Sequence, residues 1–132
     1  MKIAVSSGSN AGLESPVDPR FGRCAFYTII DVEAGKVTNV QSLPNAAVSA
    51  FHGAGIQATQ MIVNTGVNAI ITGNLGPTAF YDLKKVEIPV YRIRTDVMVS
   101  QALEMLLQKK LSRISQPGIP HRGKILNYGL FQ

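Results

Sequence analysis

The sequence predicts an α/β protein with a mixed five-stranded sheet flanked by helices. Short apolar, β-branched segments at 2–6 and 68–72 are typical of strands buried on both faces. A glycine turn precedes each of two helical segments, one starting after residue 53 and one after residue 76. Because helices alternate with strands in the second half of the chain, we expect parallel pairing there.

Three strands are expected before the first helix. Residues 2–6 (KIAVS) form the first, and residues 25–32 (AFYTIIDV) and 37–43 (VTNVQSL) form the second and third. Between the last two, the segment EAGK at 33–36 has a glycine where a hairpin turn tolerates a positive φ. The second and third strands are therefore predicted to form an antiparallel hairpin.

The first helix is predicted to follow the turn HGAG, which begins at residue 52. Its apolar residues fall on one helical face: Ala54, Ala58, Met61 and Ile62. Gly66 stands where a left-handed cap ends a helix most easily. We therefore expect the helix to end just before this glycine.

The second helix follows the fourth strand, which is predicted over residues 68–72 (NAIIT). A turn from Gly73 to Gly76 joins the two elements. Pro77 suits the first position of a helix, where no backbone N–H is needed.

The last predicted elements are a fifth strand and a third helix. The strand covers residues 88–93, and Pro89 near its start favours an edge position. Thr95 is the expected N-cap of the helix, whose apolar pattern extends to Leu111. From residue 115 the composition SQPGIPHRG breaks helical structure.

The order of elements is therefore βββαβαβα. With right-handed crossovers, strands one, four and five are parallel, which is the arrangement of a ribonuclease-H-like fold. A chain of 132 residues is large enough for a single core. We expect one domain over 1–114, followed by a basic, flexible tail over 115–132.

The positive charge is concentrated at the C-terminal end. Residues 109–132 contain five basic residues and no acid, so the other 13 − 5 = 8 basic residues balance the 8 acids. A basic tail can contact nucleic acid, a membrane surface or an acidic partner. The alternative is a solvated tail, which we favour, and we do not expect nucleic-acid binding.

No apolar run approaches the roughly 20 residues that span a bilayer. The N-terminus MKIAVSS lacks the long apolar core of a signal peptide. We therefore expect no membrane association and a cytoplasmic location.

The two glycine turns predict a binding site. Each turn lies at a helix N-terminus, where free backbone N–H groups attract anions or electron-rich ligands. Gly53 and Gly55 come from the first turn, and Asn74 in the second could add an amide. Arg20 and Arg23, in the segment DPRFGRC, could neutralise an anion or pair with a neighbouring acid. The alternative is that the turns need glycine for structural reasons alone.

A long neutral segment suggests a protein contact. No Asp, Glu, Lys or Arg occurs between Lys36 and Asp82. Gln57, Gln60 and Asn64 should face outwards on the first helix, and amides cost less to desolvate than ions. A homodimer contact on this face is a hypothesis.

The chain resembles the dinitrogenase iron-molybdenum cofactor family. The matching motifs are MKIAV, DPRFGRC, HGAG, GVNAIITGNLGP and IPVYR, which occur in this order over roughly residues 1–107. That family includes the NifX and NafY cofactor carriers, the C-terminal part of NifB and many small stand-alone proteins. The resemblance implies a non-catalytic protein that transiently carries an iron-sulfur or iron-molybdenum-type cluster. It also suggests cluster-assembly partners, including P-loop scaffold ATPases.

Cys24 and His52 are the metal-ligand candidates under this resemblance. Cys24 is the only cysteine, so one chain can form neither an intrachain disulfide nor a four-cysteine cluster site. Its thiolate suits iron, but a free cysteine is often only a small buried hydrophobe. His52 precedes the first glycine turn and could instead cap the helix. His121, in the tail, is a weaker candidate.

Three functions from other classes compete with a cluster carrier. A ribonuclease-H-type nuclease needs carboxylates that hold two metals, and the first strand, first helix and end of the fourth strand contain none. The sequence therefore excludes that nuclease. A module that binds a phosphate-bearing metabolite without metal remains open, as does a pure protein-interaction module.

Overall fold

The computed structural model describes residues 1–47, 53–94 and 96–118. Six strands form one sheet in the order β3-β2-β1-β4-β5-β6. Their bounds are Lys2–Ser7 (β1), Phe26–Glu33 (β2), Lys36–Pro44 (β3), Ala69–Thr72 (β4), Val90–Arg92 (β5) and Ser112–Arg113 (β6). The helices are Ala54–Asn64 (α1), Pro77–Lys85 (α2) and Val99–Leu107 (α3), with a 3-10 turn at Gly12–Glu14 (η1).

Strand pairing confirms the predicted mixed sheet. The strands β1, β4 and β5 are parallel to one another, and β2 runs antiparallel to both β1 and β3. The β2–β3 turn has positive φ values at Ala34 (52°) and Gly35 (77°), the geometry of the predicted tight hairpin. Gly66 has a φ of 79° just after α1, and Pro77 begins α2.

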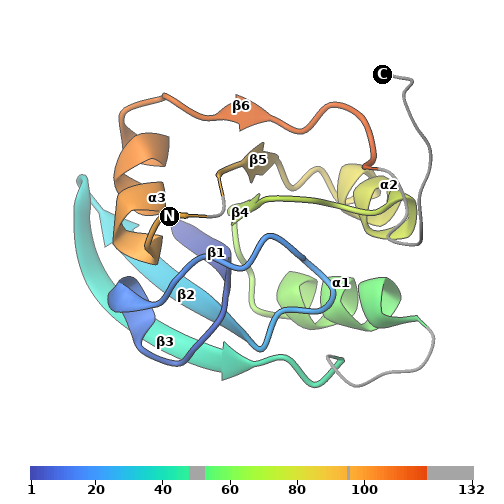
Figure 1. Ribbon diagram of the computed structural model, residues 1–132. Helices are drawn as coiled ribbons and strands as arrows, with labels where there is room; N and C mark the ends of the chain where they lie inside the picture. The colour runs from blue at the N-terminus through green and yellow to red at the C-terminus, as the bar shows by residue number, and fades with distance from the viewer. Residues whose placement is uncertain (48–52, 95, 119–132) are drawn as a thin grey trace.

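The sheet lies between α3 on one side and α1 and α2 on the other, as Figure 1 shows, and an apolar cluster fills each side. One face, through residues such as Ala4 and Ile70, packs against α1 and α2. The other face, through residues such as Ile3 and Ile71, packs against α3. Adjacent residues of β1 thus serve opposite cores, which is why the strand is apolar throughout.

The predicted count of five strands was wrong by one. The sixth strand, β6, pairs antiparallel with Tyr91 and Arg92 of β5. Consequently β5 is an interior strand, and the edge position predicted from Pro89 is also wrong. The Pro89 carbonyl still takes part in the sheet, because it accepts a hydrogen bond from the Ile70 N–H at 3.0 Å.

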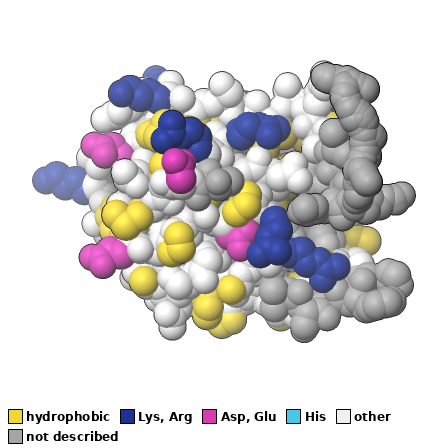
Figure 2. All heavy atoms as spheres, viewed as in Figure 1, with side chains coloured by type: hydrophobic (Ala, Val, Ile, Leu, Met, Phe, Trp, Pro, Cys, Tyr) yellow, Lys and Arg dark blue, Asp and Glu magenta, His cyan; other side chains and the backbone are white. Residues whose placement is uncertain are grey.

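The third helix is shorter than predicted. It ends at Leu107, and Lys109 has a φ of 60°, so the chain turns away before Leu111 and continues into β6. The N-cap is Met98, and Thr95 lies outside the described residues. In the view of Figure 2, apolar, basic and acidic side chains are interspersed, and no continuous apolar patch appears on that face.

Candidate functional site

A pocket of about 420 Å³ lies where the two predicted glycine turns meet the segment DPRFGRC. Its walls come from three segments: residues 20–23, the start of α1 and the start of α2 with Asn74. Five residues predicted from the sequence line this candidate pocket together: Arg20, Arg23, Gly53, Gly55 and Asn74. Residues as far apart as 20 and 74 therefore form one site.

Both helices present their N-terminal ends to the candidate pocket. Gly53 is the N-cap of α1, with a φ of 74°, and Gly76 is the N-cap of α2. At neither helix does the N-cap side chain form a hydrogen bond to the first turn, and neither first turn contains an acidic residue. The first-turn N–H groups, together with the positive ends of two helix dipoles, therefore favour an anion or an electron-rich ligand.

A close backbone contact brings the first two walls together. A Cβ placed on Gly22 would come within 3.3 Å of the Gly55 N atom, which is tighter than ordinary van der Waals contact. Gly22 has no side chain, so the backbone of residues 20–23 lies directly beside the first turn of α1. This glycine had not been singled out from the sequence.

The segment 18–24, which we call the arginine loop, is fixed at its beginning by strand-end hydroxyls. Ser6 Oγ, at the end of β1, donates to the Asp18 carbonyl at 2.6 Å and lies 2.8 Å from Thr72 Oγ1 at the end of β4. The Asn74 N–H donates to the Pro19 carbonyl at 2.6 Å. The Ser6 and Thr72 side chains are fully buried, so the hydrogen bonds of their hydroxyl groups are shielded from water.

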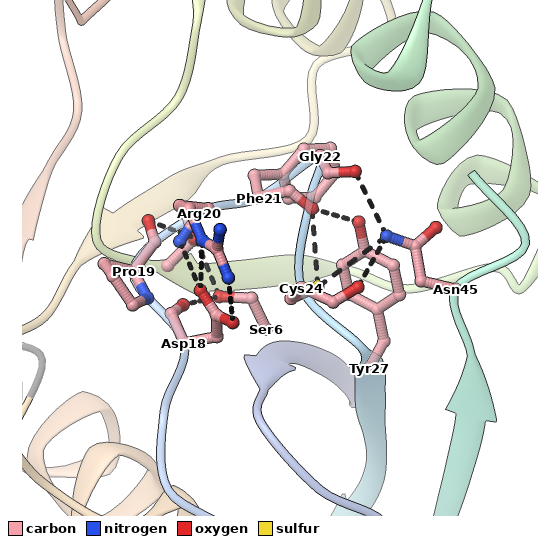
Figure 3. A network of polar contacts seen from close by, with 10 residues as sticks. Ser6, Asp18, Pro19, Arg20, Phe21, Gly22, Cys24, Tyr27 and Asn45 are labelled. Atoms are coloured by element: carbon pink, nitrogen blue, oxygen red, sulfur yellow. Dashed lines mark hydrogen bonds and ion pairs between the residues drawn. The ribbon is translucent and has the colours of Figure 1, made fainter. Parts of the chain in front are cut away.

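The end of the arginine loop is fixed by two side chains from the hairpin (Figure 3). Asn45 Nδ2 donates to the Gly22 carbonyl at 3.1 Å and to the Cys24 carbonyl at 2.8 Å. The Tyr27 hydroxyl donates to the Phe21 carbonyl. Since both side chains are buried, the loop is held in one shape before any ligand binds.

Arg20 is paired within the loop. Its Nη2 lies 3.2 Å from Asp18 Oδ2, and its Nε donates to Asp18 Oδ1 at 3.2 Å (Figure 3). The Asp18 carboxylate raises the pKa of Arg20 through this hydrogen bond and through its charge. The guanidinium side chain is still about half exposed, at 51%, and can contact a ligand in the candidate pocket.

Cys24 does not line the candidate pocket. Its side chain is 0% accessible, with Sγ 3.5 Å from the Phe21 carbonyl, which agrees with the buried alternative weighed for a free cysteine. Burial raises the pKa of the Cys24 thiol to about 11, so the thiolate that iron requires is disfavoured. In this conformation Cys24 is a core residue, and its predicted ligand role has no geometric support.

The two histidine candidates are in parts of the chain that the structure does not describe. His52 and His121 lie outside the described residues, so their roles stay predictions. Over residues 1–47, 53–94 and 96–118, no group of three or more His, Cys, Asp or Glu side chains could hold a metal ion. Within that part of the chain, the pocket offers N–H groups, an amide and guanidinium groups.

The residues that shape the arginine loop were missed in the sequence. Ser6 and Thr72 gave a faint signal, because each is a hydroxyl residue at the end of an otherwise apolar strand. Asn45 and Tyr27 gave none, because their importance depends on which carbonyl groups the fold brings beside them. No described helix is long and apolar enough to cross a bilayer.

The fold and the pocket define a small α/β protein with a pocket whose lining groups are hydrogen-bond donors and cations that suit an anion. The chain belongs to the dinitrogenase iron-molybdenum cofactor family, whose family model matches residues 1–109. This match confirms the resemblance inferred from the five motifs. The proposed division at residue 114 stays a prediction.

Three relatives illustrate the similarity. An uncharacterised protein of Methanocaldococcus jannaschii is 34% identical over 113 residues, which cover 86% of this chain and 91% of that protein. The apo form of the orange protein from Desulfovibrio gigas is 32% identical, with a TM-score of 0.80 over 89% of this chain and 96% of that one. A candidate NifB protein from Thermotoga is 29% identical, with a TM-score of 0.75 over 90% and 97%.

Proposed function

We propose that this protein carries a metal–sulfur cluster of the iron-sulfur or iron-molybdenum type and holds it transiently in the candidate pocket. The observation that carries the proposal is the convergence of Arg20, Arg23 and two uncapped helix N-termini on one preformed cavity. Membership of the dinitrogenase iron-molybdenum cofactor family and similarity to a protein described in an apo form support this cargo.

The cluster would be held mainly through contacts to its sulfides and its negative charge. Backbone N–H groups and guanidinium groups donate hydrogen bonds to anionic acceptors, and charge-assisted bonds are the stronger class. The described lining contains no Asp, Glu, His or Cys, so the cargo would arrive with its metal ions already ligated. His52 keeps its predicted role as an additional contact next to Gly53.

The proposal contains no catalytic step. General acid–base or nucleophilic chemistry needs a titratable or nucleophilic side chain in contact with the ligand. Among the described lining residues, Thr78 offers the only hydroxyl, and no base lines the pocket beside it. The described residues therefore support binding and transfer.

Partners would approach over the exposed face of α1. Ile56 lines the pocket and is 44% exposed, and Gln57, Gln60 and Asn64 continue an exposed, uncharged surface along the helix. Such a surface is cheaper to desolvate than a charged one. We propose cluster-assembly proteins, including P-loop scaffold ATPases, as exchange partners, and a homodimer as an alternative use of this face.

The test is anaerobic loading with ferrous iron and sulfide, with and without molybdate, followed by visible absorption and elemental analysis. We expect wild type to take up stoichiometric cargo and Arg23→Gln to bind it at least about tenfold more weakly, because a charge-assisted contact is lost. Arg94→Gln is the matched control, since Arg94 is exposed and pairs with Asp96 away from the pocket. Cys24→Ala should load normally, because its side chain is buried.

The stoichiometry distinguishes the possible arrangements. Half a cluster per chain would indicate a site shared by two copies. Absence of iron and sulfide from loaded wild type would refute the cluster proposal for the isolated chain.

A second candidate function is binding of a phosphate-bearing metabolite without metal. It is favoured by the absence of metal-ligating groups from the described lining, because the same N–H and guanidinium donors suit phosphate. Metal-free protein whose melting temperature rises with a phosphate compound, but which takes up no iron and sulfide, would select this function.

A further inference from the structure

The segment 115–118, which follows β6, is fixed at both of its ends. Just before the segment, the buried Ile114 donates its N–H to the Val90 carbonyl of β5 at 2.8 Å. At its end, the Gly118 N–H donates to the Leu75 carbonyl at 2.7 Å, in the turn that precedes α2 (Figure 1). The segment lies beyond residues 1–109, which the family model matches. A part of the chain outside the family match is therefore held beside the second glycine turn.

Gly118 packs against the side chain of Asn74. A Cβ built on Gly118 would overlap Asn74 Oδ1 and come within 3.0 Å of Asn74 Cγ. The φ of Gly118 is not in the positive range that favours glycine, so the space taken by the Asn74 side chain is what requires glycine here. Asn74 lines the candidate pocket and Gly118 does not. Asn74 therefore lies between Gly118 and the pocket.

The backbone of Asn74 is fixed by the arginine loop, whereas its side-chain amide is available to a ligand. The Asn74 N–H donates to the Pro19 carbonyl at 2.6 Å, and the Asn74 carbonyl accepts from the Phe21 N–H at 3.3 Å. Within the described part of the chain, the Asn74 amide forms no hydrogen bond. Oδ1 and Nδ2 lie on opposite sides of Cγ, so an oxygen directed at Gly118 leaves the donor Nδ2 directed away from it.

We propose that Gly118 is a positioning residue that directs the Asn74 amide donor at the anionic ligand of the candidate pocket. Because Gly118 has no side chain, the Asn74 carboxamide fits between its main chain and the pocket, and a methyl group on Gly118 would displace it. The inference rests on the proposed function, because it needs a ligand with an anionic acceptor, such as a sulfide or a phosphate oxygen, in that site.

The overlap should affect ligand binding far more than folding. Asn74 Oδ1 is the end of a side chain that can rotate, so Gly118→Ala can relieve the overlap by moving the amide. We therefore expect the melting temperature of Gly118→Ala to stay within about 3 °C of wild type. The displaced amide can no longer donate to the ligand. Because the lost hydrogen bond has a charged acceptor, ligand binding should weaken about tenfold.

The test is a double-mutant cycle in the full-length protein. The variants are Gly118→Ala, Asn74→Ala and the two substitutions together. Gln116→Ala is the control, because Gln116 is exposed in the same segment and does not line the candidate pocket. Two probes separate the ligand sources. Release of anaerobically loaded iron–sulfide cargo to a chelator reports on a cluster, and calorimetric titration with inorganic pyrophosphate reports on a phosphate ligand.

The double variant gives the decisive result. We expect Gly118→Ala and Asn74→Ala each to bind the probe about tenfold more weakly than wild type. The double variant should match Asn74→Ala within about twofold, because Gly118→Ala then has no amide to displace. The Gln116→Ala control should stay within about twofold of wild type.

Three outcomes would overturn the inference. If Gly118→Ala binds a probe as wild type does, the positioning role is refuted and the proposed function stands. If Gly118→Ala weakens binding equally with and without the Asn74 side chain, or lowers the melting temperature well beyond 3 °C, it acts through the main chain, and the positioning role is again refuted. If wild type binds neither probe, the proposed function fails as well.

Discussion

Replacing Asn45 by alanine should destabilise the protein far more than its position just beyond a strand suggests. The side chain is 3% exposed and makes three hydrogen bonds to backbone groups: two from Nδ2 to the carbonyls of Gly22 and Cys24, and one accepted by Oδ1 from the Ala47 N–H at 2.9 Å. Each bond contributes about 1 kcal/mol net, and a buried group left without a partner costs about 1–3 kcal/mol. We therefore expect Asn45→Ala to lower the free energy of unfolding by about 3 kcal/mol.

The assay is urea denaturation followed by circular dichroism, with a two-state fit. Asn39→Ala is the control, because Asn39 is an exposed asparagine whose amide donates to Asp31 Oδ2 at 3.3 Å. The control should change stability by less than about 0.5 kcal/mol. A loss below about 1 kcal/mol in Asn45→Ala, or an equal loss in the control, would refute the role assigned to the buried amide.

The acid variant Asn45→Asp adds a pH signature. At neutral pH its carboxylate would face two carbonyl oxygens, whereas the protonated acid can still donate one hydrogen bond. Burial beside these acceptors should raise the pKa of this group in the folded state, so the variant should regain stability as the pH falls towards 4. A pH-independent difference from wild type would contradict the hydrogen-bond geometry of the loop.

Three other predictions concern the arginine loop and its surroundings. With the pKa of the Cys24 thiol at about 11 instead of 9.0, the thiolate population at pH 8 falls about a hundredfold. Folded protein should therefore react with a thiol reagent at least about a hundredfold more slowly than urea-unfolded protein. Similar rates would mean that the Cys24 side chain is open to solvent. Because the folded pKa of this acid lies above its unfolded value, stability should be intact below pH 9 and should fall by about 2–3 kcal/mol between pH 9 and 11, a decline that Cys24→Ala should reduce. Gly73→Ala should destabilise the protein by about 1–3 kcal/mol and weaken cargo binding, because its Cβ would come within 2.8 Å of the Pro19 Cα. Gly35→Ala controls for the loss of a glycine, because its Cβ would meet nothing within 4 Å and only its positive φ adds backbone strain. Unchanged stability in Gly73→Ala would show that Pro19 can move freely.

Most of the fold was predictable because the local signals for helix ends, turns and strands match the helices, turns and strands that the fold contains. Gly66 and Pro77 mark the end of α1 and the beginning of α2, since each suits only a few backbone positions. The β6 strand was not predictable, because Ser112 and Arg113 are two exposed residues without periodicity. Their pairing depends on where α3 ends and leaves the chain beside β5.

The candidate site was predictable where it depends on backbone groups and unpredictable where it depends on tertiary contacts. The glycine turns were found because free N–H groups follow directly from a helix N-terminus. The sequence left the burial of Cys24 open, because the same loop exposes Arg20 and buries its own end. Which side of the loop faces inwards is decided by Asn45 and Tyr27, residues from a hairpin whose position relative to the loop no local pattern reveals.

The candidate pocket combines a rigid loop with contacts that do not coordinate a metal ion, and this combination suits the proposed carrier. A cluster held by Cys thiolates leaves only after each metal–sulfur bond is exchanged, whereas one held by N–H and guanidinium groups leaves when those weaker contacts break. The hydrogen bonds from Ser6, Asn45 and Tyr27 are made by protein groups alone, so they persist whether or not cargo is present. The loop is thereby ordered in advance, and little of the binding free energy is lost in ordering it. Cargo can then be bound with useful affinity while its metal ions stay accessible to a recipient that offers true ligands.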